Sequence, residues 1–388
     1  MCSSDLGVAL QFAIAFLFLK FQPVVVAFTW FATGFTKVIG FADEGKRFLF
    51  GNVTDMNGAW GFVFAIQVLP IIVFFSSLMS LLYYLGIMQR VVSAMAVVLR
   101  RTLGISGAEA LSGAANIFLG QTEAPLTVKP FIPSMTRSQL MCIMVGGFAT
   151  IAASVMAAYI VMVGGEDPAA QVEVARNLLT ASVMSAPAGV VVSKLMLPET
   201  EAVPDESLGA LRDMPRTAAN VMDAAAEGAI DGLKLALNVA GMLVAFVSLI
   251  ALLNWPLSAI DPGLSFQSIL GWVLQPLAWT MGAGAESKAI GSLMGTQVIA
   301  TELVAYKDLA GLLKSHAITP RGATIATYAL CGFANLPSIA IQIGGLGAMA
   351  PSRRADFASI GLRAMVAGAL ACWMTGAFAG VFVPVAGG

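Results

Sequence analysis

The sequence has 388 residues, of which 58% are hydrophobic and only 11% are charged. A soluble domain usually carries about 25% charged residues, so this composition excludes an ordinary soluble protein and predicts a membrane-integral chain. The formal net charge of −1 gives no electrostatic reason to bind nucleic acid.

Four stretches without a charged residue reach the length of about 20 residues that a membrane-spanning helix needs. They are 57–85, 141–163, 235–255 and 365–385. Strong alternation of polar and apolar residues, the mark of a membrane barrel, is missing from the sequence. We therefore predict an all-α polytopic membrane protein, built from transmembrane helices, two re-entrant helical hairpins and broken helices in an inverted repeat.

The chain begins with two apolar runs, 6–19 and 23–40, which Lys20 and Pro23 separate. We expect one short or incomplete segment, then one span, with the first span of the fold missing or truncated. A further span is predicted at about 58–86.

Arg90, Arg100 and Arg101 follow that span with apolar residues between them. This pattern is typical of an amphipathic helix that lies on the cytoplasmic membrane surface. The loop 164–173 is acidic and lacks a basic residue, so the positive-inside rule places it on the outer side.

Residues 106–133 contain apolar runs that are too short to span singly, and they are cut at 120–125. Two half-length helices that meet at this cut would form a re-entrant hairpin, which is tolerated where protein or a cavity surrounds its tip. The apolar stretch 139–163 follows and contains a break at Gly147-Phe148-Ala149.

The stretch 199–234 is the most polar part of the chain. Its polar residues recur every three or four positions and predict a polar stripe on a helix that leads into the span 235–255, with a solvated connector as the simplest role. These residues are Arg216, Asn220, Asp223, Glu227, Asp231 and Lys234.

After the connector the pattern of hairpin and broken helix returns. We predict a second hairpin at 283–312 with its cut near Thr301-Glu302, a broken helix at 322–350 and a last span at 360–385. The expected units are 1–100 (scaffold), 101–198 (first transport repeat), 199–260 (connector and scaffold span), 261–350 (second transport repeat) and 351–388 (last span).

Two pairs of motifs make the repeat visible. Thr122-Glu123 and Thr301-Glu302 are 179 positions apart, and Gly147-Phe148-Ala149 and Gly332-Phe333-Ala334 are 185 apart. Carboxylates at membrane depth are costly and usually face a cavity or a partner. Corresponding interruptions in two halves point to the central binding site of a transporter.

Gln121, Thr122 and Glu123 can converge on one ligand only if the backbone is irregular there, because neighbours on a helix point about 100° apart. Two alternatives stay open: an exposed loop between ordinary helices, and an interfacial position for Glu302 near Lys307.

In the second half, Pro337 opens the helix near Phe333, so that Asn335 and Ser338 offer neutral hydrogen-bonding groups. Simple lipid or core packing is the alternative for Phe333. The hydroxyls of Thr150 and Ser154, beside unwound carbonyls, suit a weakly held Na⁺ ion. The alternative for Thr150 is that the helix is intact and its hydroxyl donates to a backbone carbonyl one turn earlier.

The candidate set contains carboxylates, amides, hydroxyls and an aromatic ring but no basic residue. An anionic substrate would favour Arg or Lys. The set therefore favours a neutral polyol that carries an aromatic part.

Four segments resemble the concentrative nucleoside transporters of the bacterial sodium-coupled type, over a region from about residue 24 to the C-terminus. The segments are Gly120-Gln121-Thr122-Glu123-Ala124-Pro125, Gly146-Gly147-Phe148-Ala149-Thr150-Ile151-Ala152, Thr301-Glu302-Leu303-Val304-Ala305-Tyr306 and Gly332-Phe333-Ala334-Asn335-Leu336-Pro337-Ser338.

The resemblance implies a homotrimer in a cell inner or plasma membrane that imports nucleosides such as uridine by an elevator-like movement, with Na⁺ as coupling ion and no organic cofactor. It assigns the nucleobase to Gln121 and Thr122, with Glu123 lining the site, and the ribose to Glu302, Asn335 and Ser338, with Phe333 close by. The family's sodium ion would lie at Asn116, Leu119, Thr150 and Ile151. The second hairpin has Thr301 where the family commonly has asparagine.

Three rivals remain at this point. A proton-coupled symporter would use Glu123 or Glu302 to carry the proton. An intramembrane enzyme is disfavoured by the single histidine, His316, and by the lack of a nucleophile–base pair. A passive channel would line its pore with recurring rings rather than one compact site.

Overall fold

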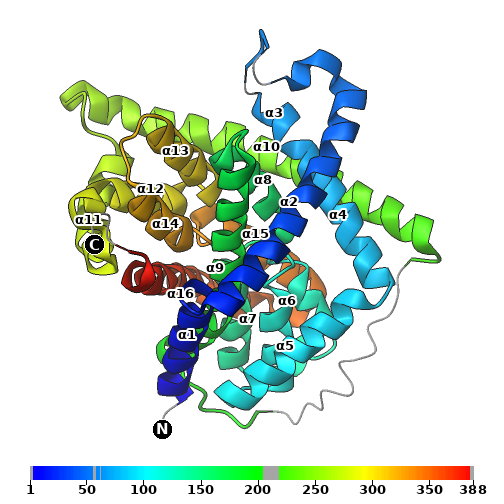
Figure 1. Cartoon of the computed structure of the whole chain (residues 1–388). Coiled ribbons are helices and arrows are strands. Elements are labelled where there is room, and N and C mark those ends of the chain that lie inside the picture. The colour runs from blue at the N-terminus through cyan, green and yellow to red at the C-terminus, as the bar shows by residue number, and fades with distance from the viewer. Residues whose placement is uncertain (1–2, 56–57, 62, 204–217, 385–388) are drawn as a thin grey trace.

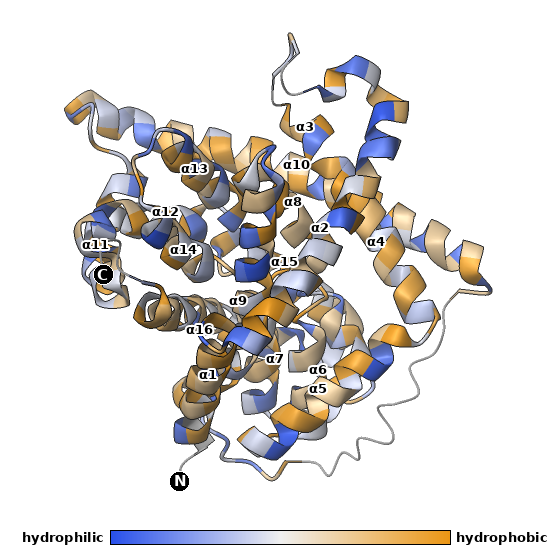
Figure 2. Ribbon diagram, in the orientation of Figure 1, coloured by the Kyte–Doolittle hydropathy of each residue, from blue (hydrophilic) through white to orange (hydrophobic). Residues whose placement is uncertain are grey.

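The computed structural model describes residues 3–55, 58–61, 63–203 and 218–384, and all regular secondary structure within these ranges is helical. Figure 2 shows hydrophobic residues along most of the helices. Six helical segments are long and apolar enough to cross a membrane: Gln22–Thr54, Phe64–Tyr84, Arg137–Gly164, Pro168–Met196, Val221–Ile260 and Pro351–Phe382. The predicted all-α membrane class is confirmed.

The N-terminal part forms α1 (Ser3–Leu19) and α2 (Gln22–Phe50), and the short turn η1 (Gly51–Thr54) follows. The helices separate at Lys20, where the sequence predicts the interruption. α2 continues about ten residues beyond the predicted end at residue 40, into a charged stretch in which the Lys46 ammonium lies 2.5 Å from the Asp43 carboxylate.

The next span begins later than predicted, at the short α3 (Phe64–Gln67), and continues as α4 (Leu69–Tyr84). α5 (Ile87–Leu103) buries one face, through Met88, Val92, Ala96, Leu99 and Leu103. Gly86 and Gly104, both with positive φ, flank this helix. The amphipathic helix is therefore present, and its place on the cytoplasmic surface stays a prediction.

The first hairpin differs from the prediction in its returning arm. The outgoing arm is α6 (Gly107–Ala115), but the chain returns through the 3₁₀ turns η2 (Ala124–Val128) and η3 (Ile132–Ser134). Pro125, Pro130 and Pro133 explain the difference, since each removes a backbone donor and clashes with the preceding helical turn.

The broken helix after the hairpin consists of α7 (Arg137–Ala149) and α8 (Ala153–Gly164). The break lies at 150–152, just after the Gly-Phe-Ala motif rather than within it. α9 (Pro168–Met196) then passes through the centre of the fold and contacts α1, α2, α7, α8 and α16.

α9 is not among the spans predicted from the sequence, because Glu173, Arg176 and Lys194 interrupt its apolar pattern. The Lys194 ammonium lies 2.6 Å from the Glu109 carboxylate on α6, which is buried, and 3.6 Å from that of Glu199. A partner inside the protein makes this charge compatible with an interior position.

α10 (Val221–Ile260) is a single helix of 40 residues that crosses the whole width of the view in Figure 1. The predicted helix that leads into the span 235–255 is therefore present, although Arg216 of the polar stripe lies outside the described residues. α10 packs along α4 so closely that a Cβ on Gly228 would lie 2.7 Å from the Ser76 carbonyl oxygen.

The second half repeats the arrangement of hairpin and broken helix. Its hairpin has the predicted cut at Ala300-Thr301, and its broken helix opens at 330–335. The helix 266–278 before the hairpin is not in the sequence prediction. The elements are α11 (Phe266–Ala278), η4 (Trp279–Ala283), η5 (Gly284–Glu286), α12 (Ser287–Ile299), α13 (Glu302–Lys314), α14 (Pro320–Ala329), α15 (Leu336–Met349), η6 (Pro351–Arg353) and α16 (Arg354–Phe382).

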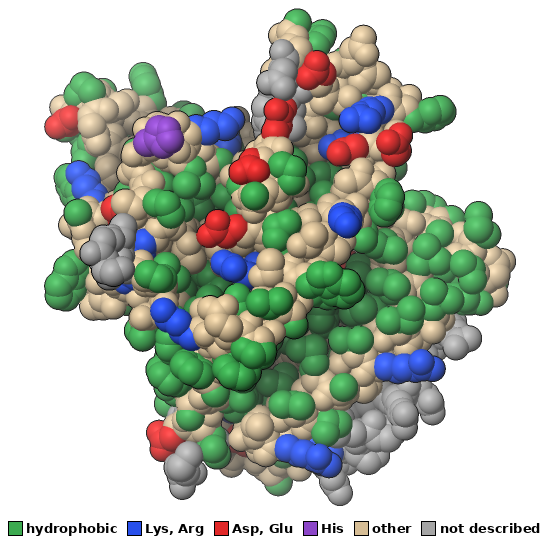
Figure 3. Space-filling model, in the orientation of Figure 1, with side chains coloured by type: hydrophobic (Ala, Val, Ile, Leu, Met, Phe, Trp, Pro, Cys, Tyr) green, Lys and Arg blue, Asp and Glu red, His purple; other side chains and the backbone are tan. Residues whose placement is uncertain are grey.

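The surface is apolar as well as the core. Figure 3 shows hydrophobic side chains over much of one face of the molecule, and Trp30, Phe48 and Trp255 are among the large apolar side chains that are exposed. A lipid environment accounts for apolar groups on both the inside and the outside.

Candidate substrate and ion site

The four interruptions of the helices meet in one place. The tips of both hairpins adjoin the two breaks, and local capping fixes two helix starts there. The Asn335 side-chain oxygen accepts a hydrogen bond of 2.9 Å from the Ser338 amide and caps α15. The Thr301 hydroxyl caps α13 in the same way, at 3.3 Å from the Val304 amide. Such caps satisfy backbone donors that a broken helix would leave unpaired.

Glu302, the first residue of α13, is held by two neutral donors. The Tyr159 hydroxyl donates to its Oε1 at 2.6 Å, and the Asn335 amide donates to its Oε2 at 2.8 Å. All three side chains are buried. Tyr159 is itself stacked on Tyr306, with ring centroids 4.6 Å apart. A buried carboxylate with two donors and no cation beside it can accept further hydrogen bonds from a ligand.

Gln121, at the tip of the first hairpin, forms the other half of this polar group. Its Nε2 donates to the Ser338 hydroxyl at 3.2 Å, and its Oε1 accepts from Gln342 Nε2 at 3.1 Å. A Cβ on Gly147 would lie 2.8 Å from Gln342 Nε2 and 2.9 Å from Gln121 Cβ. The tip can rest on α7 only because this position is glycine.

Together these contacts form one hydrogen-bonded chain, which we call the polar chain. It contains Tyr159, Glu302, Asn335, Ser338, Gln121 and Gln342. Four of the seven predicted substrate residues lie in it, and they come from both hairpins and from the second broken helix.

The other three predicted substrate residues lie beside the polar chain. Thr122 is half-buried against Gly345 of α15, and Phe333 is half-buried in the break. The Glu123 carboxylate accepts from the Gly120 amide at 3.3 Å and faces a cavity of about 480 Å³ between the hairpin, α4 and α10. Leu119 and Ser154 also line this cavity.

The predicted ion ligands gather where the first hairpin meets the first break. The Asn116 amide is fully buried, and within the described residues neither its nitrogen nor its oxygen has a hydrogen-bond partner. Its nitrogen would lie 2.9 Å from a Cβ on Gly146, whose carbonyl accepts from the Thr150 hydroxyl at 2.9 Å.

Backbone contacts close this region. The Ala153 amide donates to the Phe118 carbonyl at 2.9 Å, which joins the hairpin to the start of α8. Thr150 and Ala152 have extended backbone, so carbonyl oxygens of the break are not aligned along a helix. An unpaired amide oxygen beside a hydroxyl and irregular carbonyls fits a Na⁺ ion, which oxygen ligands coordinate. Leu119 and Ile151 are buried in the same region.

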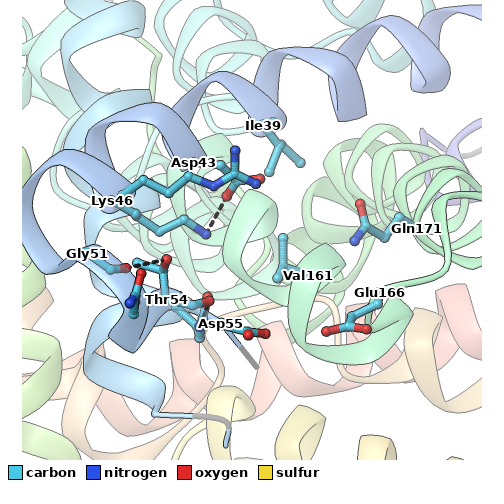
Figure 4. A pocket seen from close by; sticks show the side chains of 13 residues that line it. Ile39, Asp43, Lys46, Gly51, Thr54, Asp55, Val161, Glu166 and Gln171 are labelled. Atoms are coloured by element: carbon cyan, nitrogen blue, oxygen red, sulfur yellow. Dashed lines mark hydrogen bonds and ion pairs between the residues drawn. The ribbon is translucent and has the colours of Figure 1, made fainter. Parts of the chain in front are cut away.

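A second cavity, of about 520 Å³, lies apart from these residues (Figure 4). The end of α2, the turn η1 and the corner between α8 and α9 surround it, and Asp43, Lys46, Glu166 and Gln171 are among its lining residues. None of the predicted site residues lines it.

Sequence reasoning missed two members of the polar chain, Tyr159 and Gln342. Both lie inside apolar helices, Tyr159 in α8 and Gln342 in α15, away from the motifs that repeat between the two halves. The available signal is weaker: each is a polar-tipped side chain within an apolar run, a position where buried polar groups need partners.

Three family models match this chain: the Na⁺ dependent nucleoside transporter C-terminus over residues 177–380, nucleoside recognition over 65–166 and the Na⁺ dependent nucleoside transporter N-terminus over 6–53. A transporter of Haemophilus influenzae is 47% identical over 90% of this chain and 83% of its own length. The sodium/nucleoside cotransporter 1 of mouse is 39% identical over 97% of this chain. The chain spans 59% of the mouse protein's length.

The fold is shared with solved structures as well. CNTnw in an inward-facing, substrate-bound state superimposes with a TM-score of 0.90 at 41% identity, over 98% of this chain and 92% of that one. A CNTnw variant in an outward-facing state also gives 0.90, at 40% identity, over 98% of this chain and 90% of that one. This protein is therefore a membrane transporter, not an enzyme, and it belongs to the Na⁺-dependent nucleoside transporter family.

Proposed function

We propose that the protein imports nucleosides across the cell inner (plasma) membrane together with Na⁺. The observation that carries this proposal is the polar chain, which joins both hairpins and the second broken helix through a carboxylate, two glutamine amides, an asparagine and hydroxyls. A compact site of this kind is suited to binding one small, uncharged polar molecule. A channel would instead line a continuous pore.

In this proposal the ribose hydroxyls donate to Glu302 and exchange hydrogen bonds with Asn335 and Ser338. The Gln121 amide, which can both donate and accept, reads the edge of the base. Phe333 offers a ring face beside it. The ligand replaces hydrogen bonds that the residues otherwise make with one another, so few polar groups are left unpaired when it leaves.

The sodium ion in this proposal bridges the first hairpin and the first break, at Asn116, Thr150 and the carbonyls of Leu119 and Ile151. Its position next to Gln121 gives the ion a direct way to order the base-binding tip. Sodium would thus raise the affinity for nucleoside. Such coupling between two binding sites is reciprocal, so nucleoside also raises the affinity for sodium.

The movement is proposed to be elevator-like, within a homotrimer. The similarity to CNTnw in both inward-facing and outward-facing states supports the movement. Exposed apolar residues of α10, such as Val244, Leu252 and Trp255, offer surface for lipid or for neighbouring copies.

Uptake into proteoliposomes tests the proposal. With uridine outside, an inward Na⁺ gradient is expected to drive accumulation above the equilibrium level, and an inward proton gradient alone is not. Accumulation driven by protons in choline buffer would replace sodium by a proton as coupling ion, and simple equilibration under both gradients would exclude secondary active transport.

The site also predicts a preference between neutral and charged substrates. Since no member of the polar chain carries a positive charge, uridine should compete for uptake of labelled uridine and uridine monophosphate should not. A competition series at equal concentrations checks this. Equal potency of the two compounds would contradict the assigned substrate class.

A conservative substitution tests the ion ligands. Thr150→Val keeps the shape of the side chain and removes its oxygen, so the Na⁺ concentration for half-maximal uptake should rise while maximal uptake at saturating Na⁺ is retained. Thr327→Val is the matched control, because the Thr327 hydroxyl also donates back along its own helix, at 2.8 Å to the Ala323 carbonyl. An unchanged sodium dependence in Thr150→Val would remove this residue from the ion site.

A further inference from the structure

The two halves of the chain dock a hairpin on a broken helix by different chemistry. In the second half the contact is made by Gln297, near the end of α12. Its side chain is fully buried, and its Nε2 donates to the carbonyls of Leu330, at 3.2 Å, and Gly332, at 2.9 Å. These carbonyls belong to the end of α14 and to the break itself, so the second hairpin is fastened to its break by two direct hydrogen bonds.

In the first half the corresponding side-chain contact is missing, and the hairpin meets the break through a backbone hydrogen bond of 2.9 Å, which the Ala153 amide donates to the Phe118 carbonyl. Asn116 likewise is a buried amide just after the outgoing helix of its hairpin, and it lies beside the first broken helix. Within the part of the chain that the structure describes, however, neither of its polar atoms has a hydrogen-bond partner. Burying a polar group without a partner is costly, so the Asn116 amide is a group that a ligand can pair.

We propose that Gln297 takes, in the second half, the place that the coupling ion takes in the first. Its amide group directs two partially positive N–H groups at two carbonyl oxygens of a broken helix, as a bound cation would do. The docking of the second hairpin is therefore independent of sodium, and sodium dependence is confined to the first hairpin. This inference rests on the proposed sodium coupling.

The consequence is an asymmetric site. The ribose side, with Glu302 and Asn335 on the hairpin and break that Gln297 joins, is formed before the ion arrives. The base side, with Gln121 on the hairpin whose Asn116 amide has no partner, gains its last docking contact when the ion binds. Gln297 acts here as a positioning residue, since it lies behind the polar chain and is not a member of it.

Hydrogen exchange of the purified full chain, without nucleoside, tests the inference directly. In Na⁺ compared with choline buffer, peptides over 107–135 and 150–153 should exchange more slowly, and peptides over 287–314 and 330–335 should not change. This comparison needs no substitution. Equal protection of both hairpins by sodium would overturn the asymmetry, and protection of neither would overturn the proposed sodium coupling and the inference with it.

A variant tests the residue itself. Gln297→Met keeps the length of the side chain and removes both donors. Exchange over 330–335 should therefore rise about tenfold or more, in Na⁺ and choline alike, since two hydrogen bonds are lost. Gln275→Met is the matched control, because the Gln275 amide makes only a 3.5 Å contact, with the Ser287 hydroxyl. Unchanged exchange over 330–335 in Gln297→Met would overturn the role.

Uridine binding measured by calorimetry separates positioning from a general structural defect. Gln297→Met should weaken binding by the same factor in both buffers, so that the ratio of the two dissociation constants stays as in the wild type. Asn116→Ala should instead bring that ratio close to one. A Gln297→Met variant that loses its sodium dependence would contradict the division between the two hairpins.

Discussion

Glu302→Gln is expected to weaken nucleoside binding about ten- to a hundred-fold. The carboxylate accepts from Tyr159 and Asn335 and still has lone pairs for ribose hydroxyls. A glutamine keeps one acceptor oxygen and turns an amide group toward one of the two donors. Losing a charge-assisted hydrogen bond costs about 1.5–3 kcal/mol, which corresponds to this change in affinity. Calorimetric titration with uridine measures it.

Tyr159→Phe is the comparison for that experiment. It removes one donor to Glu302 and leaves the carboxylate, whose free lone pair a ribose hydroxyl can use. Its effect on affinity should therefore be smaller than that of Glu302→Gln. Wild-type affinity in a folded Glu302→Gln protein would show that this carboxylate does not bind the substrate.

The second large effect is expected for stability, at the buried ion pair between Lys194 and Glu109. Lys194→Met leaves the Glu109 carboxylate, whose side chain is only 2% exposed, without its cation. Breaking a buried pair from one side costs about 3–5 kcal/mol. We expect a clear drop in the thermal unfolding temperature of the detergent-purified protein, because the buried Glu109 carboxylate is left without a compensating charge.

The double variant Glu109→Gln with Lys194→Met controls for this interpretation. It removes both charges and keeps an acceptor for the Ser106 amide, which donates to Glu109 at 3.0 Å. It should unfold at a higher temperature than Lys194→Met alone. A double variant that is as unstable as the single one would mean that packing, not the unpaired charge, causes the loss.

The sequence predicts the features of this fold that have a local cause. Gln121 stands out because glycine and proline flank the polar groups that interrupt an apolar run, and Glu302 because its carboxylate lies among apolar residues. The structure places a cut near each of them. The position of a cut follows from backbone chemistry within a few residues. The returning arm of the first hairpin is also local in origin, since three prolines explain it once it is seen.

Contacts between distant segments could not be predicted in this way. Tyr159 meets Glu302 across 143 positions, and Gln342 meets Gln121 across 221. The span α9 could not be predicted for the same reason. Lys194 can be buried only because Glu109, which lies far away in the sequence, neutralises its charge. The roles of the site residues thus depend on tertiary partners that no periodicity records.

The length of α10 has a consequence for the surrounding bilayer. Its apolar part, residues 235–260, is about 39 Å long at 1.5 Å per residue, whereas the hydrocarbon layer is about 30 Å thick. A helix longer than the layer accommodates the difference by tilting, by kinking or by thickening the layer locally. Since Gly228 and Gly232 allow α10 to pack tightly against α4, a tilt of α10 would tilt α4 with it. A thinner bilayer would favour a larger tilt. The thickness of the host membrane therefore contributes to the orientation of the protein within it.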